Sequence, residues 1–265
     1  MKKGAFKTRY DSYYPWVFLA ICLMIWQLAA GYFKIPTYIL PAPWAIISKG
    51  IEIWPTLLHH LLVTLEEILV GFVLGSLLGA FLAFFISYYA LARKIFLPYM
   101  VAFQTMPKLG LAPLFIIWFG FGFLTNITIV TSISFFPILV NFFAGLDQFN
   151  ENEERLMASY NASKNQIYFH VRVFRAFPFL FAGLQLGIIL SVTGAIVAEF
   201  IAGNEGLGYL TILANNNLET AMMFCALLLL GIIGFVFYHI MDFIQKVLMP
   251  WATKTKTLTG SESGL

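Results

Sequence analysis

Long runs of apolar residues, separated by short polar segments, dominate the chain. A bilayer core of about 30 Å is crossed by about 20 apolar residues in a helix, and a helix satisfies its own backbone hydrogen bonds in lipid. The pattern therefore predicts an all-α, polytopic membrane protein with one transmembrane domain over residues 16–250. Its six predicted transmembrane helices are residues 16–33, 68–92, 95–119, 124–146, 179–203 and 220–241.

Two boundaries of these spans rest on local signals. The long apolar run 109–146 is divided at Gly120 and Gly122, because glycines and polar residues cluster there as in a turn. Glu66 and Glu67 directly precede the second span, and a solvated helix start explains their charges. The polar ends of the chain are predicted to be an N-terminal segment, residues 1–15, and a flexible tail, residues 251–265.

Composition narrows the class of protein. Hydrophobic residues make up 60% of the chain and charged residues 11%, against roughly 45–50% and 25% in soluble domains. A soluble enzyme, a disordered chain and a nucleic-acid-binding domain are excluded on these grounds. The two cysteines, Cys22 and Cys225, lie inside apolar runs, so no disulfide framework is expected.

The basic residues gather on one side of the predicted membrane. Thirteen of the sixteen lysines and arginines precede span one, follow span six, or lie between spans two and three or spans four and five. Lys34 and Lys49 fall on the other side, and Lys108 is ambiguous. Because basic residues concentrate in cytoplasmic loops, both termini are predicted to be cytoplasmic. This surplus faces anionic lipid head groups, and nucleic acid is not needed to explain it.

The chain lacks the motifs of several chemistries. It has no P-loop, so it is not expected to bind ATP phosphates itself. It also lacks the nucleophile elbow of serine hydrolases and the zinc motif of metalloproteases. His59 and His60 are adjacent and would point about 100° apart on a helix, and the other two histidines stand alone. We therefore expect no catalytic residue, no metal site and no cofactor in this chain.

The longest polar stretch inside the chain is the predicted cytoplasmic loop 147–177. Asn150 with Glu153 has the spacing of a capping box, and Ser163 with Gln166 repeats it. Each pair marks the start of a helix. The loop is therefore predicted to fold as two short helices joined by a turn.

The residues around this turn sharpen the prediction. Asn161 suits the left-handed position that ends the first helix. On the second helix Ile167, Val171 and Phe174 share one face, and Pro178 is predicted to mark a boundary before span five. On pattern alone, the helix pair either rests on the membrane surface or docks with a soluble partner.

At this point the sequence resembles a known family. Residues 161–171, N-A-S-K-N-Q-I-Y-F-H-V, followed by Pro178, resemble the EAA loop of binding-protein-dependent ABC importer permeases. Asn161 replaces the family's glycine, and residues 155–157 lack the glutamate and alanine that give the loop its name. Further segments are similar to the nitrate/sulfonate/taurine-type branch: L-P-A-P at 40–43, M-P-K-L-G-L-A-P-L-F-I-I-W-F-G at 106–120, and E-F-I-A-G-N-E-G-L-G-Y at 199–209.

The resemblance implies the fold of a type I ABC importer permease in a bacterial inner membrane. It also implies a homodimer, two ATP-binding subunits that hold ATP and Mg, and an extracellular solute-binding protein. The solute would be nitrate, a sulfonate or taurine, or a vitamin precursor. The residues implied to couple to the ATPase are Asn161, Ala162, Ser163, Lys164, Gln166, Tyr168, Val171 and Pro178.

A few polar groups inside the spans are candidates for a translocation path. Lys108 stands among prolines, and broken backbone is tolerated at membrane depth where it lines a cavity; a kinked helix with a snorkelling lysine is the alternative. Glu199 is either a gate or solute-facing carboxylate, or an interfacial residue bonded to outer-loop backbone. The hydroxyls of Ser191 and Thr193 either face the path or bond back to their own helix. The full candidate set is Gln104, Thr105, Lys108, Ser191, Thr193 and Glu199.

Small residues in span five indicate close helix packing. Gly183, Gly187 and Gly194 remove side-chain bulk from that helix, as at helix contacts in membranes, either within the chain or in a dimer. Two other classes of protein fit the sequence less well. A stand-alone secondary carrier or channel would need more polar groups inside the spans and usually internal repeats, and a membrane-embedded enzyme would need the motifs that are missing.

Overall fold

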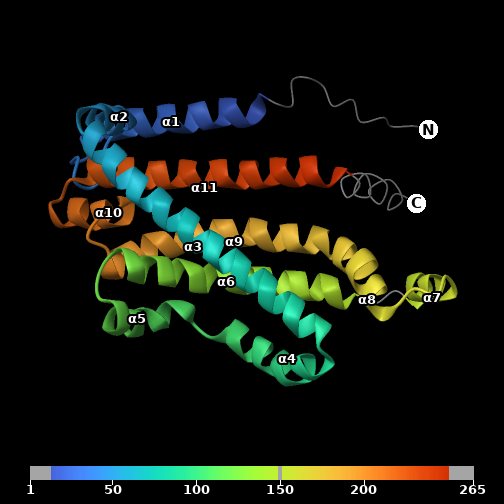
Figure 1. The fold of residues 1–265 in the computed structure, drawn as a ribbon. Coiled ribbons are helices and arrows are strands. Elements are labelled where there is room, and N and C mark those ends of the chain that lie inside the picture. The colour runs from blue at the N-terminus through green and yellow to red at the C-terminus, as the bar shows by residue number, and fades with distance from the viewer. Residues whose placement is uncertain (1–12, 149–150, 251–265) are drawn as a thin grey trace, which may run out of the picture.

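The computed structural model describes residues 13–148 and 151–250. These residues are helical apart from short connections (Figure 1). The helices are α1 (Tyr14–Tyr32), α2 (Pro43–Glu52), α3 (Trp54–Tyr88), α4 (Ala90–Thr105), η1 (Lys108–Leu111), α5 (Ala112–Phe119), α6 (Phe123–Asp147), α7 (Glu151–Ser159), α8 (Lys164–Ile167), η2 (Tyr168–Arg172), α9 (Val173–Ala202), α10 (Leu207–Asn216) and α11 (Thr220–Leu248).

Within the described residues, five helical stretches are long and apolar enough to cross a membrane, where the sequence predicts six. They are α1, α3, α6, the stretch from α8 through α9, and α11. The predicted third span, 95–119, is broken into α4, a 3₁₀ turn (η1) and α5. Met106 and Pro107 are extended at the break, because proline disfavours helical backbone before it and has no N–H to donate.

The second span also differs from the prediction. The helix α3 begins at Trp54 and ends at Tyr88, so Glu66 and Glu67 lie well inside it rather than at its start. Glu67 is 1% exposed, and a solvated helix start does not describe it. A membrane helix can carry such a carboxyl where it faces the bundle interior and has polar partners.

The centre of the bundle is α6, which packs most extensively against α9 and α3. Both neighbours turn glycines toward it. A Cβ at Gly75 of α3 would lie 2.2 Å from Ser134 Oγ, and one at Gly183 of α9 would lie 3.0 Å from Ile138 Cα. The backbones approach closely only because these side chains are missing.

The other glycines on the same helix faces also lie close to α6. Gly71 and Gly79 complete the α3 seam against α6, while Gly187 and Gly194 of α9 face Ile138 and Ile133 of α6. Thus the three glycines predicted to pack do so inside one chain.

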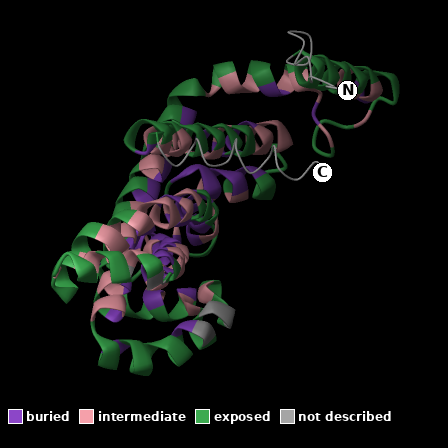
Figure 2. Cartoon of the chain, turned by 90° about the vertical axis from the view of Figure 1, so that its right-hand side faces the viewer, coloured by how far each residue is buried: buried purple, intermediate pink, exposed green. Residues whose placement is uncertain are grey.

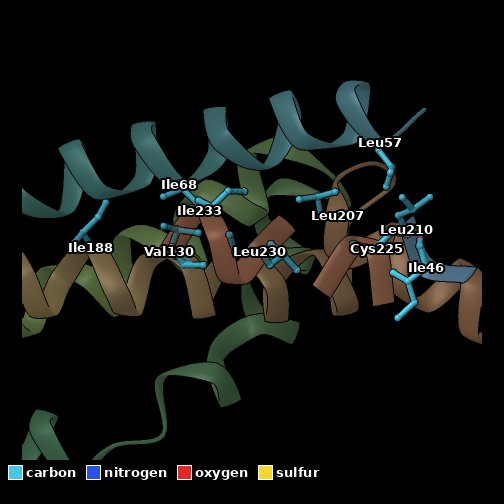
Figure 3. Packing of buried hydrophobic residues seen from close by; sticks show 13 residues of the cluster. Ile46, Leu57, Ile68, Val130, Ile188, Leu207, Leu210, Cys225, Leu230 and Ile233 are labelled. Carbon is cyan, nitrogen blue, oxygen red and sulfur yellow. Dashed lines mark hydrogen bonds between the residues drawn. The ribbon is translucent and has the colours of Figure 1, made fainter. Parts of the chain in front are cut away.

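A cluster of buried aliphatic residues joins the remaining helices to this centre. Figure 3 shows α3, α9, α10, α11 and α2 contributing side chains to one continuous core. The edges of the bundle are less covered (Figure 2). On α1, for example, Trp16 is 67% exposed and Leu28 is 65% exposed. Apolar faces of this kind are suited to lipid or to another membrane subunit.

The described helices place distinct features at the two ends of the bundle. The start of α1, the end of α11 and the segment α7–α8 lie at one end, and α2, α5 and α10 lie at the other (Figure 1). We call these the loop end and the α10 end.

Candidate functional site

A helical hairpin projects at the loop end (Figure 1). Its first helix is α7, and Asn161 follows with a left-handed φ of 58°, as predicted for an asparagine that ends a helix. The N–H of Ala162 donates to the Met157 carbonyl oxygen at 3.1 Å, which closes the turn. The predicted cap Asn150 lies outside the described residues.

The second helix of the hairpin starts where the sequence predicts. The Ser163 side chain accepts from the Gln166 N–H at 3.3 Å, and the Ser163 N–H donates to the Gln166 side chain at 2.8 Å. This reciprocal capping box fixes the direction in which the chain leaves the turn. The side chains of Lys164 and Gln166 are exposed next to it.

The prediction that Pro178 separates this helix from span five is wrong. The segment continues from α8 through the π-helical turn η2 into α9, and Pro178 lies inside α9. Proline bends a helix rather than ending it where neighbouring helices hold both sides. The hairpin is therefore a direct extension of a central membrane helix.

Tyr168 anchors the hairpin to the bundle. Its ring is buried, lies 5.5 Å from the ring of Phe84 and 5.1 Å from that of Tyr88, and its hydroxyl donates to the Phe84 carbonyl oxygen at 3.3 Å. An ion pair of 2.9 Å between Arg175 and Glu153 ties α7 to α9. Val171, which lies in η2 with Tyr168, is half-buried.

The outer face of the hairpin carries apolar side chains that the bundle does not cover. Leu156 is 57% exposed and Tyr160 is 77% exposed, beside the small side chain of Ala162. Leu156 and Tyr160 are thus apolar groups of the hairpin that the rest of the described chain leaves uncovered.

The candidate path residues do not form one group. Lys108 and Thr193 line a common recess of about 290 Å³ between η1, α6 and α9. The Lys108 ammonium also lies 4.6 Å from the centre of the Phe136 ring. Ser191 is buried and donates to the Gly187 carbonyl oxygen at 2.8 Å. The side chains of Gln104 and Thr105 lie outside the part of the chain that the structure describes.

Glu199 lies at the α10 end, where it binds the start of α10. The first N–H groups of a helix have no partner within the helix. Here the N–H of Gly208 donates to Glu199, and the N–H of Leu207 donates to Thr64 Oγ1 at 2.8 Å. The Thr64 hydroxyl in turn donates to Glu199 Oε1 at 2.7 Å. A carboxylate is also favoured there by the helix dipole.

This arrangement explains the glycines that follow Glu199. Gly206 has a φ of 106°, which side chains of L-residues rarely allow, and its N–H donates to His60 Nδ1 at 3.0 Å. A Cβ at Gly206 would lie 2.2 Å from the Glu199 carboxyl carbon, and one at Gly208 would lie 2.8 Å from Glu199 Oε2. The two glycines of the E-x₆-G-L-G sequence thus leave room for the buried Glu199 carboxylate.

A second buried carboxyl, missed in the sequence, adjoins the first. Glu67 accepts a hydrogen bond from the Asn126 amide at 2.8 Å, and its carboxyl interacts with that of Glu199. Both Glu67 and Asn126 are 1% exposed. We call Thr64, Glu67, Asn126 and Glu199 the buried polar cluster; it links α3, α6, α9 and α10.

The fold and these sites define a class: a polytopic membrane protein with an exposed helical hairpin at one end. The chain matches the family described as binding-protein-dependent transport system inner membrane component over residues 71–254. The chain belongs to this family, and it is an ABC transporter permease of the import type.

Named relatives fall in the same group. The formylaminopyrimidine transport permease ThiX of Halalkalibacterium halodurans is 30% identical over 249 residues, which cover 94% of this chain and 99% of the relative. The riboflavin transport system permease RibX of Chloroflexus aurantiacus is 34% identical, and the match covers 89% of this chain and 88% of the relative. The taurine transport permease TauC of Escherichia coli is 27% identical, and the match covers 88% of this chain and 87% of the relative.

Proposed function

We propose that this permease forms the translocation path of an ATP-driven importer and works with a separate ATPase. Two copies of the chain pair in a bacterial inner membrane with both termini in the cytoplasm. Two ATP-binding subunits dock on the loop end, and an extracellular solute-binding protein delivers solute to the α10 end. ATP and Mg bind the ATPase subunits, and this chain binds no cofactor.

The observation that carries the proposal is the helical hairpin α7–α8. It is capped and closed by its own hydrogen bonds, it is anchored by Tyr168, and it presents Leu156 and Tyr160 outward. Conformational work passes between subunits only through a contact that does not deform. The caps, the turn and the Tyr168 anchor hold this hairpin in one conformation, which suits it to that contact.

The distribution of charge supports the orientation. Arg93, Lys94, Lys164 and Arg175 lie on segments of the loop end, and basic residues concentrate on the cytoplasmic side of membrane proteins. A cysteine at Lys164 should therefore be unreactive to an impermeant reagent in intact cells. Labelling of that cysteine from outside would end the importer interpretation.

The class of solute follows from the relatives only in outline. Their names concern a formylaminopyrimidine, riboflavin and taurine. We infer a small solute of the nitrate, sulfonate/taurine or vitamin-precursor class.

The test is Ala162→Asp, which places a charge at the tightest point of the hairpin. A buried charge without a partner weakens a contact strongly, so the variant should lose both co-purification with the ATPase and solute uptake. It should still reach the membrane, because Ala162 is not part of the bundle core. The matched control is Ala90→Asp, which adds the same charge at the exposed start of α4.

Ala90→Asp should keep ATPase binding and uptake. If Ala162→Asp keeps both as well, the hairpin is not the coupling element. Uptake that survives removal of the ATPase would instead indicate a stand-alone carrier.

A further inference from the structure

Lys108, at the break between α4 and η1, lies level with the middle of the bundle. Its ammonium is 4.6 Å from the centre of the Phe136 ring, and Phe136 is near the middle of the 25-residue helix α6. The backbone at Met106 and Pro107 is extended at the break. Because such backbone is tolerated at membrane depth where it is buried in protein or lines a cavity, we looked for a cavity beside this lysine.

A cavity of about 510 Å³ adjoins Lys108 between α3, α4, η1 and α6. Phenylalanines form much of its wall, and the described lining residues with polar side-chain atoms are Tyr99, Lys108 and Ser132. We call it the aromatic cavity. Its volume lies in the range of sites that hold small molecules, and such sites combine apolar walls with a few polar groups. The aromatic cavity has both properties.

The Lys108 ammonium has no counter-charge in the part of the chain that the structure describes. Its one partner there is the face of the Phe136 ring, and no described carboxylate lies close to it. Ionisable side chains inside a membrane protein normally pair with an opposite charge or line a pathway. An aromatic face attracts a cation more weakly than an anionic group does. An unpaired ammonium between apolar walls therefore indicates an anionic ligand.

The side chain of Lys108 is accessible to such a ligand. It is half-buried, and it lines both the aromatic cavity and the recess of about 290 Å³ between η1, α6 and α9. A ligand in the aromatic cavity therefore reaches the ammonium without breaking an ion pair within the described chain.

We propose that the aromatic cavity binds the transported solute, and that this solute is an organic anion with an apolar or aromatic body. The Lys108 ammonium pairs with the negative group, and the rings of Phe103 and Phe136 contact the body. An aliphatic or aromatic sulfonate meets both requirements. Nitrate has no body to bury against the rings, and taurine would bring a second ammonium beside Lys108.

The unpaired ammonium favours a solute over the other occupants of an apolar cavity. A lipid acyl chain suits the walls but carries no charge for Lys108, because anionic head groups lie at the membrane surface rather than at this depth. A second copy of this chain seated in the cavity would exclude a solute, and the test detects that outcome. The proposal rests on the proposed function, because it takes this chain as the path of an importer.

The experiment measures binding of naphthalene-2-sulfonate to the assembled transporter in lipid nanodiscs by isothermal titration calorimetry. The heat of binding to empty nanodiscs of the same lipid is subtracted. Naphthalene-2-sulfonamide has the same body without the charge. The sulfonate should bind about tenfold more tightly than the sulfonamide, because a hydrogen bond between charged groups adds about that much affinity.

Variants separate the charge from the walls. Lys108→Met removes the charge but keeps an unbranched side chain, so it should weaken sulfonate binding about tenfold and leave sulfonamide binding unchanged. Lys108→Arg should keep sulfonate binding. The matched control is Lys94→Met, on an exposed residue of α4 outside the cavity, which should bind like the parent. Ser132→Leu narrows the cavity and should weaken binding of naphthalene-2-sulfonate more than that of ethanesulfonate.

Equal affinity for the sulfonate and the sulfonamide, or sulfonate binding that Lys108→Met leaves unchanged, would overturn the proposal. Absence of sulfonate binding to the parent at millimolar concentration, as expected if a second copy or lipid fills the cavity, would also overturn it. If Lys108→Met does not fold, the two naphthalene probes and Ser132→Leu decide the outcome. Co-purification with the ATPase is scored on the same preparations. If it fails, the proposed function is wrong; if it persists while charge selection fails, only the cavity proposal is wrong.

Discussion

The two ends of this permease differ in how far their distinctive side chains are buried. At the α10 end, Thr64, Glu67, Asn126 and Glu199 are almost completely buried and bind one another or the start of α10. At the loop end, Leu156 and Tyr160 are exposed, and the hairpin is held by local caps. The polar groups of the first end bind mostly one another, and the apolar side chains of the second are left exposed.

This difference separates two kinds of sensitivity to mutation. A change in the buried polar cluster removes partners from groups that cannot reach water, so it should lower stability. A change on the hairpin surface should leave the fold intact and affect only association. The predictions below test whether the two ends divide in this way.

The largest effect is expected for Glu199→Ala. The variant leaves the Gly208 N–H without its acceptor and the Thr64 hydroxyl without its carboxylate. Leaving a buried hydrogen-bonding group without its partner costs roughly 1–3 kcal/mol, and two such groups are affected, so thermal unfolding in detergent should shift strongly downward. Glu205→Ala, on an exposed residue of the same end, is the control and should unfold like the parent. Parent-like unfolding of Glu199→Ala would show that the cluster does not hold this end.

Gly75→Leu tests the close contact between α3 and α6 at the centre of the bundle, between the two ends. Its side chain would enter the space of Ser134, whose Oγ lies 2.2 Å from the added Cβ position. Overpacking costs roughly 1–3 kcal/mol, so the yield of folded protein and its unfolding temperature should fall. Gly183→Leu should lower the yield and the unfolding temperature in the same way. Gly231→Leu is the matched control, because no atom of a neighbouring helix lies within 4 Å of a Cβ there, and it should be tolerated.

The smallest effect is expected for Asn161→Gly at the hairpin. Asn161 is left-handed, and glycine adopts that conformation freely, so stability should change by less than about 1 kcal/mol and uptake should persist. Ala158→Gly, inside α7, should instead lower stability by about 1 kcal/mol, as glycine does in helices. A loss of uptake with Asn161→Gly alone would show that the asparagine side chain itself contacts the ATPase.

Local signals in the sequence predicted the loop end well. The left-handed Asn161 and the capping box of Ser163 with Gln166 depend on residues at most three positions apart, so the pattern contains all the interacting groups. The apolar runs predicted the long helices for the same reason, because lipid imposes its requirement on each segment separately. Pro178 was misjudged because packing by neighbouring helices overrides a local breaker.

The bond from Glu199 to the backbone that follows its helix was one of the two alternatives drawn from the sequence, and it is confirmed. The rest of the buried polar cluster was not predicted, because its contacts join distant segments. Glu67 and Asn126 are 59 positions apart, and Thr64 and Glu199 are 135 apart. Two signals of close packing near these residues were nonetheless present in the sequence. The glycines after Glu199 mark a crowded backbone, and Gly71, Gly75 and Gly79 repeat at four-residue intervals, which is the spacing of a close helix contact.

The unbroken helical stretch from Lys164 to Ala202 has a mechanical consequence. Its 39 residues span about 58 Å at about 1.5 Å per residue. Ser163 caps its first turn, and Glu199 lies in its last turn. A tilt of about 5° about its middle would move each end by about 2.5 Å, which exceeds the tolerance of a hydrogen bond. We expect a tilt of this stretch to displace both the hairpin and the bonds that hold α10, because they lie at the two ends of one helical stretch.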